Sequence, residues 1–67
     1  MAQLSPYLLS TLEKLLARID KDISRLQKMR ENQRISAETR QEIEKKIGDL
    51  RGSRLEITQL MSRLERL

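Results

Sequence analysis

Few side chains in this sequence of 67 residues have the chemistry that catalysis or metal binding requires. The chain has no His and no Cys. It therefore lacks the usual general base, the most reactive nucleophile and the ligands that zinc prefers. Two carboxylate pairs, Asp20 with Asp22 and Glu42 with Glu44, lie in stretches rich in Lys and Arg, and we interpret them as solvated surface charge. The sequence predicts a protein that is not an enzyme and that uses no cofactor and no metal.

The positively charged residues are the other group of side chains that could bind a partner. There are 14 Lys and Arg against 10 Asp and Glu, a net charge of +4, and the two signs are interleaved as on solvated helix faces. The local basic excess consists of Lys21, Arg25, Lys28, Arg30 and Arg34. It fits solvated surface, an acidic protein partner or nucleic acid. Nucleic acid has the least support, because no recognised binding motif and no aromatic stacking platform accompany these residues.

The apolar residues that must position these groups follow a heptad pattern in the first half of the chain. They are Leu9, Leu12, Leu16, Ile19, Ile23 and Leu26. Their alternating steps of three and four predict an amphipathic helix over about residues 6–32. Ser5 as N-cap and Pro6 as the first helical residue mark its start, with Leu4 and Leu9 as a hydrophobic staple.

A second helix is predicted over about residues 37–66 after a turn at about 33–36. Its seam consists of Ile43, Ile47, Leu50, Ile57, Met61 and Leu64. Ser36 is a good N-cap, and Asn32 is expected to end the first helix in the left-handed region. The alternative is one continuous helix of about 60 residues, which is rare in globular proteins. Folding about residues 34–35 brings the two seams into register, which favours the hairpin.

Both apolar faces are wider than a two-helix seam requires. The residues that widen them occupy heptad position g and are Leu8, Leu15, Met29, Leu60 and Leu67. Two helices alone leave such residues partly exposed, and an apolar strip of this length is typical of an interface. We therefore expect an all-α, coiled-coil-like antiparallel hairpin, a single domain over residues 1–67, that completes a bundle with another chain. These g residues and Arg54 are the predicted partner-binding residues.

Two features of the second helix remain open at this point. Arg54 occupies an a position of the seam, opposite Leu16. It either extends to solvent with its stem packed on Leu16 or pairs with a carboxylate of a partner. Gly48 and Gly52 lie four residues apart. They form either a second contact face or a weak, bent helical segment.

Length, hairpin layout and the lack of catalytic residues resemble the small co-chaperones of type III secretion needle subunits. The similarity extends from Leu8 to Leu64, with Leu12-Glu13-Lys14-Leu15-Leu16 and Arg40-Gln41-Glu42 as its local points. The resemblance implies a helical hairpin in the bacterial cytoplasm. There it would join a helical-repeat chaperone and keep the needle subunit from polymerising early.

The predicted function is protein–protein interaction through the apolar face, as a small chaperone or co-chaperone of a bacterial secretion apparatus. The alternatives are a basic nucleic-acid-associated regulator and a homodimeric four-helix bundle with a structural role. We expect the protein to form an oligomer or a hetero-complex. Residues Met1 to Tyr7 lack a basic region followed by an apolar stretch, and no apolar run approaches membrane-spanning length. We therefore expect a cytoplasmic protein with no membrane partner.

Overall fold

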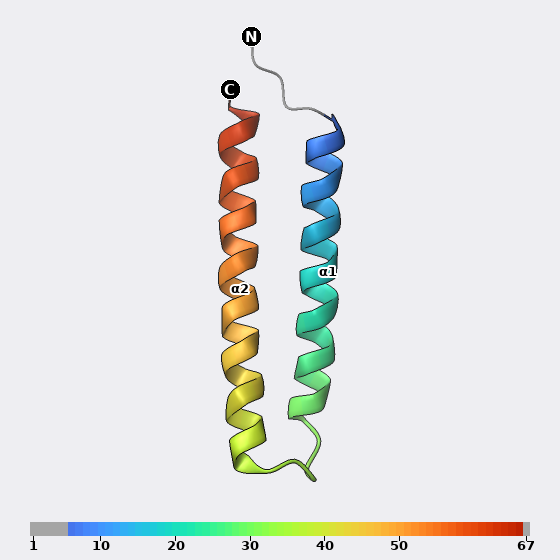
Figure 1. Cartoon of the computed structure of the whole chain (residues 1–67), viewed down its shortest axis with the longest axis vertical. Coiled ribbons are helices and arrows are strands. Elements are labelled where there is room, and N and C mark those ends of the chain that lie inside the picture. Colours follow the sequence, from blue (N-terminus) through green and yellow to red (C-terminus); the bar gives the residue numbers. More distant parts are fainter. Residues whose placement is uncertain (1–5, 67) are drawn as a thin grey trace.

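The computed structural model describes residues 6–66, which form two helices. Helix α1 spans Pro6–Arg30 and helix α2 spans Ala37–Glu65. The helices lie side by side in opposite directions, joined by one short connection (Figure 1). The principal extents of 55 × 15 × 10 Å describe a flat rod two helices wide. The predicted all-α antiparallel hairpin is confirmed, and the alternative of one continuous helix is wrong.

The connection between the helices begins earlier than predicted, because α1 ends at Arg30. The N–H of Asn32 donates to the carbonyl of Met29 at 3.1 Å, which tightens the last turn of the helix. The Oδ1 atom of Asn32 then accepts from the N–H of Arg34 at 3.0 Å, as in an Asx turn. No described residue has a positive φ. The predicted left-handed Asn32 is therefore wrong, because its side chain organises the turn without that conformation.

Helix α2 begins where its N-cap signal predicts. Ser36 has extended backbone angles (φ −72°, ψ 162°), and its Oγ accepts a hydrogen bond from the N–H of Thr39 at 3.1 Å. Glu38 in the first turn places negative charge at the positive end of the helix dipole. The Ser36 cap is confirmed. The predicted Ser5 cap and the Leu4 side of the staple lie outside the described residues.

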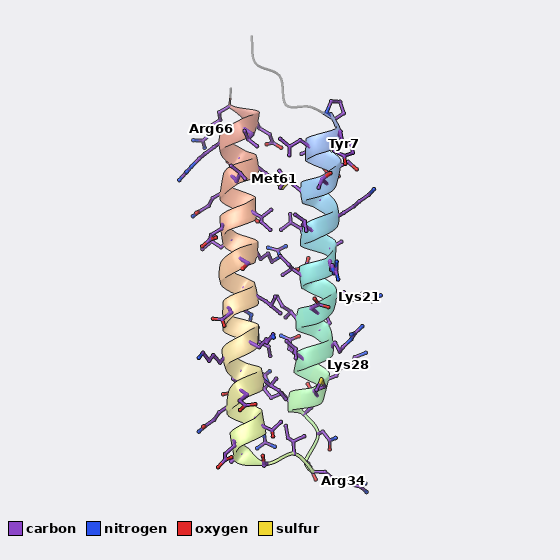
Figure 2. The ribbon with its side chains drawn as sticks, viewed as in Figure 1. Tyr7, Lys21, Lys28, Arg34, Met61 and Arg66 are labelled. Atoms are coloured by element: carbon purple, nitrogen blue, oxygen red, sulfur yellow. The ribbon has the colours of Figure 1, made fainter. Side chains whose placement is uncertain are left out.

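The core lies between the two heptad seams, with Met61 among the side chains between the helices (Figure 2). All twelve predicted seam residues are buried or half-buried, and the buried ones are Leu12, Ile23, Ile43 and Ile47. Ile23, Ile43 and Ile47 form one cluster near the turn. Half-buried Ile35 of the connection also packs against this cluster, a contact that the seam pattern did not indicate. The core is thus one layer of side chains with the turn closed over its end.

Candidate interaction surfaces

The first candidate surface is the apolar strip, which we define as Leu8, Leu15, Met29 and Leu60. Their exposed fractions are 41%, 43%, 47% and 45%, respectively. In an antiparallel pair the g positions of both helices border the same side of the seam, so these side chains share one side of the hairpin. Their predicted exposure is confirmed, whereas their role in binding stays a prediction. Leu67, the remaining predicted member, lies outside the described residues.

The apolar strip is densest at the end of the hairpin opposite the turn. Leu8 lies in the first turn of α1 and Leu60 near the end of α2, both away from the connection, and Leu15 follows Leu8 by two turns along α1. Half-buried Asp22 occupies the next g position of α1 and separates this group from Met29. Asp22 directly precedes Ile23, so it lies beside the core cluster that contains Ile23 and Ile47. The apolar contact area therefore lies mainly where the intramolecular core is thinner.

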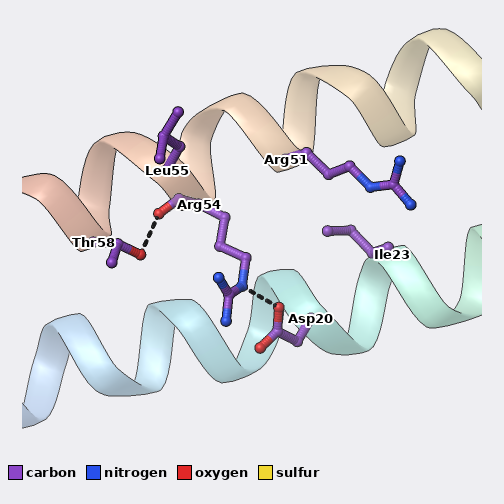
Figure 3. Close-up of a pocket in the computed structure, with 6 residues that line it drawn as sticks. All are labelled: Asp20, Ile23, Arg51, Arg54, Leu55 and Thr58. Carbon is purple, nitrogen blue, oxygen red and sulfur yellow. Dashed lines mark hydrogen bonds and ion pairs between the residues drawn. The ribbon is translucent and has the colours of Figure 1, made fainter.

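Arg54 is the second candidate feature, and its guanidinium pairs within this chain. Its Nε donates to Oδ1 of Asp20 at 2.7 Å (Figure 3). Side chains on a helix lean toward its N-terminus, and in an antiparallel pair this direction carries Arg54 past Leu16 to the next turn of α1. The interpretation of Asp20 as merely solvated charge therefore needs correction. A carboxylate of the same chain thus takes the role that one of the two alternatives gives to a partner, and contact of Arg54 with a partner stays a prediction.

The ion pair borders an open groove along one side of the hairpin. The groove is lined by Asp20, Ile23, Arg51, Arg54, Leu55 and Thr58 (Figure 3). The Oγ1 atom of Thr58 donates to the carbonyl oxygen of Arg54 at 2.8 Å. About half of each ion-paired side chain is exposed, 48% for Arg54 and 51% for Asp20. An exposed pair of this kind contributes about 0.2–1 kcal/mol, so it stabilises the hairpin only slightly.

Gly48 and Gly52 lie on an open face of α2. A Cβ atom built at either glycine meets nothing within 4 Å, and the helix runs through both positions without interruption. No described part of this chain therefore requires glycine at these positions. Leu55, the next residue on that face, is 58% exposed. Contact of this face with another molecule stays open.

The cationic side chains form a more regular surface than the local basic excess that the sequence indicates. We define the basic stripe as Lys14, Arg18, Lys21, Arg25 and Lys28, which are all exposed. Lys21 and Lys28 project from α1 on the side away from α2 (Figure 2). Steps of four and three residues keep all five within an arc of about 80°. Of the other predicted members, Arg30 is half-buried and Arg34 lies in the turn.

The basic stripe places like charges next to one another four times in succession. Each like-charge pair at i,i+3 or i,i+4 destabilises a helix by about 0.2–0.5 kcal/mol. Within residues 6–66, the ion pair of Arg54 with Asp20 is the only one, so none of the five cations of the stripe is ion-paired. The signal in the sequence is the helical spacing of these cations. A search for local basic excess finds only Lys21, Arg25 and Lys28, because Asp20 and Asp22 separate them from Lys14 and Arg18 in the chain.

The described residues offer neither a metal site nor a membrane-spanning helix. No three acidic side chains among residues 6–66 lie close enough together to hold a metal ion. Neither α1 nor α2 has an apolar stretch that would cross a bilayer. The fold and its surfaces define the class of two-helix antiparallel hairpins with exposed apolar and basic faces. Comparison of the chain with protein-family models, curated proteins and solved structures finds no match in any of the three.

Proposed function

We propose that this protein is an interaction module that completes a helical bundle with another helical chain. The supporting observation is the apolar strip, whose side chains are 41–47% exposed beside a seam with four buried residues. Burying these side chains against a second apolar helix face would stabilise the complex by roughly 25 cal/mol per Å² of area removed from water. Binding is therefore driven by apolar contact, and the charged faces remain in solvent.

The accessible surface of the hairpin supports this proposal. The chain exposes 5776 Å². A compact monomer of this mass is expected to expose about 4,400 Å². The excess is of the order that one partner contributes to a stable interface, about 800 Å² or more. A second pair of helices on the apolar strip would supply the missing layer of a four-helix bundle.

The biological setting of the proposal comes from the resemblance to needle-subunit co-chaperones. The hairpin layout on which this resemblance rests is observed in the structure. In that setting the protein acts in the bacterial cytoplasm, and its partner is a larger helical chaperone. A second copy of this chain is the other candidate partner, and it would form a homodimeric bundle with the apolar strips meeting across a two-fold axis.

Size-exclusion chromatography with light scattering, combined with circular dichroism, tests the proposal on the pure protein. We expect either a folded dimer or a poorly folded chain that gains helicity with its partner, because the hairpin alone leaves the apolar strip in water. A dimer identifies the second copy as the partner, and a poorly folded chain identifies a different one. A fully helical monomer at about 200 µM would contradict the need for a bundle partner.

A matched pair of variants then locates the interface. Leu15→Gln places an amide on the apolar strip, and Leu55→Gln makes the same change on the open face of α2. We expect Leu15→Gln to weaken association at least about tenfold, equivalent to about 1.4 kcal/mol. Leu55→Gln should change association less than about twofold, because it lies off the apolar strip. A larger effect of Leu55→Gln would move the interface to the glycine face.

A further inference from the structure

We propose that the basic stripe on the outer face of α1 binds the phosphate backbone of double-stranded nucleic acid. The basic stripe lies opposite the seam of α1, so it is a different surface from the apolar strip. It remains exposed whether or not the hairpin has joined a bundle. The inference is therefore independent of the proposed protein–protein function.

The distribution of charge between the helices carries the first part of the inference. Helix α1 has six Lys or Arg and three Asp or Glu, whereas α2 has six of each. Most of the net charge of +4 therefore belongs to α1. Asp20, one of its three acids, is paired with Arg54. The outer face of α1 thus presents five cations and no acid between them.

The geometry of the basic stripe suits a long, regular polyanion. Lys14 and Lys28 are fourteen residues apart, so the stripe is about 21 Å long at 1.5 Å per residue. Duplex DNA advances about 3.4 Å per base pair, so the stripe spans about six base pairs. Helix α1 lies straight beside α2 (Figure 1), so the backbone positions of the five cations are fixed before binding. A preformed row of charges loses less freedom on binding than a flexible basic tail.

The residues beside the basic stripe favour a nucleic-acid backbone over a membrane. Ser10, Ala17 and Ser24 line one edge of the stripe and are exposed, whereas Asp22 and the apolar strip border its other edge. Small side chains permit close approach, and serine hydroxyls are common phosphate ligands. Membrane-surface helices instead insert a wide apolar face beside their basic residues, whereas α2 covers the seam of α1 and leaves only single apolar residues such as Leu15 and Met29 on that flank. The chain has a single aromatic residue, Tyr7, which favours a duplex over a single strand bound by stacking.

Fluorescence anisotropy with a labelled 20-base-pair duplex of mixed sequence tests the inference. For five phosphate contacts we expect a slope near −4.5 in log affinity against log salt, or about a 500-fold loss between 50 and 200 mM. The Lys14→Gln/Lys21→Gln variant should reduce this slope by about 2 and weaken binding at 100 mM at least about tenfold. Binding should not depend on base sequence, since phosphate contacts carry no sequence information.

A matched variant separates the basic stripe from the overall charge of a basic protein. Lys45→Gln/Lys46→Gln removes the same two charges from exposed positions on α2. We expect it to weaken duplex binding less than about threefold. Equal losses in the two variants, or a wild-type slope shallower than about −2, would overturn the inference.

Two further measurements complete the test. Binding to vesicles containing phosphatidylserine, without binding to the duplex, would assign the basic stripe to a membrane surface and overturn the inference. Leu15→Gln should bind the duplex with the wild-type salt slope, even where it disrupts protein association. Circular dichroism of each variant should show the helicity of the wild type, so that a loss of binding reports the stripe and not the fold.

Discussion

At the scale of single residues, Arg54 has the least expected environment. It occupies a seam position that would otherwise hold an apolar side chain, and its guanidinium reaches the Asp20 carboxylate at the edge of the groove. The stem of Arg54 thus crosses the level of Leu16 while its charge remains partly in water. The ion pair therefore gives the guanidinium of Arg54 a partner but adds little stability.

Replacing Arg54 tests this interpretation. Arg54→Leu extends the apolar seam opposite Leu16 and removes only an exposed ion pair. We expect the free energy of unfolding to rise by about 1 kcal/mol in urea denaturation followed by circular dichroism. Asp20→Asn, which removes the pair but keeps the arginine, should lower it by no more than about 1 kcal/mol. A net loss in Arg54→Leu would show that the ion pair contributes more than the missing apolar contact.

At the scale of the elements, each helix carries different types of residue on its different faces. Helix α1 buries its seam, borders the apolar strip on one flank and carries the basic stripe on its outer face. Helix α2 buries the matching seam but carries two glycines and Leu55 on an open side. Its backbone is a regular helix at both glycines, where each lacks the side chain that would restrict the unfolded chain.

Alanine substitutions at the two glycine positions test whether this face contacts another chain or is only a weak part of the helix. Gly48→Ala and Gly52→Ala should each raise the free energy of unfolding by about 1 kcal/mol, because the added Cβ atoms meet nothing in the hairpin. Chemical denaturation measures this gain. Light scattering on the same variants reports association, and weaker association together with higher stability would show that another chain approaches these glycines closely.

At the scale of the whole molecule, the hairpin depends on a thin core. The buried residues are Leu12, Ile23, Ile43 and Ile47, and three of the four cluster near the turn. A domain of this size has a free energy of unfolding of roughly 3–10 kcal/mol. One core side chain can therefore represent a large fraction of the total, and a bundle partner would add to it.

The most buried residue, Ile47, is the sharpest test of the core. It is 2% exposed, and Ile47→Ala should lower the free energy of unfolding by about 2–5 kcal/mol, enough to unfold much of the isolated chain. Thermal melting followed by circular dichroism measures the change. Leu55→Ala, at 58% exposure, should change stability by less than about 0.5 kcal/mol. Comparable losses in the two variants would contradict the observed core.

The helical hairpin, the seam residues, the Ser36 cap and the exposure of the apolar strip were predictable from the sequence. These features depend on spacing along one helix or on one residue at a helix end, and heptad position determines which side a residue occupies. The end of α1 and the conformation of Asn32 were predicted wrongly. Hydrogen bonds among Met29, Asn32 and Arg34 determine both, and such short-range alternatives have similar energies in a turn.

The sequence by itself determined that two amphipathic helices form and that their apolar faces are too wide for each other. Only the tertiary structure decided two further points. It brought Arg54 to Asp20 and packed Ile35 over the end of the core. The physical reason is that these outcomes depend on the antiparallel register and on the lean of side chains toward the helix N-terminus. Periodicity predicts the side on which a residue lies, whereas the neighbouring helix determines what that residue contacts.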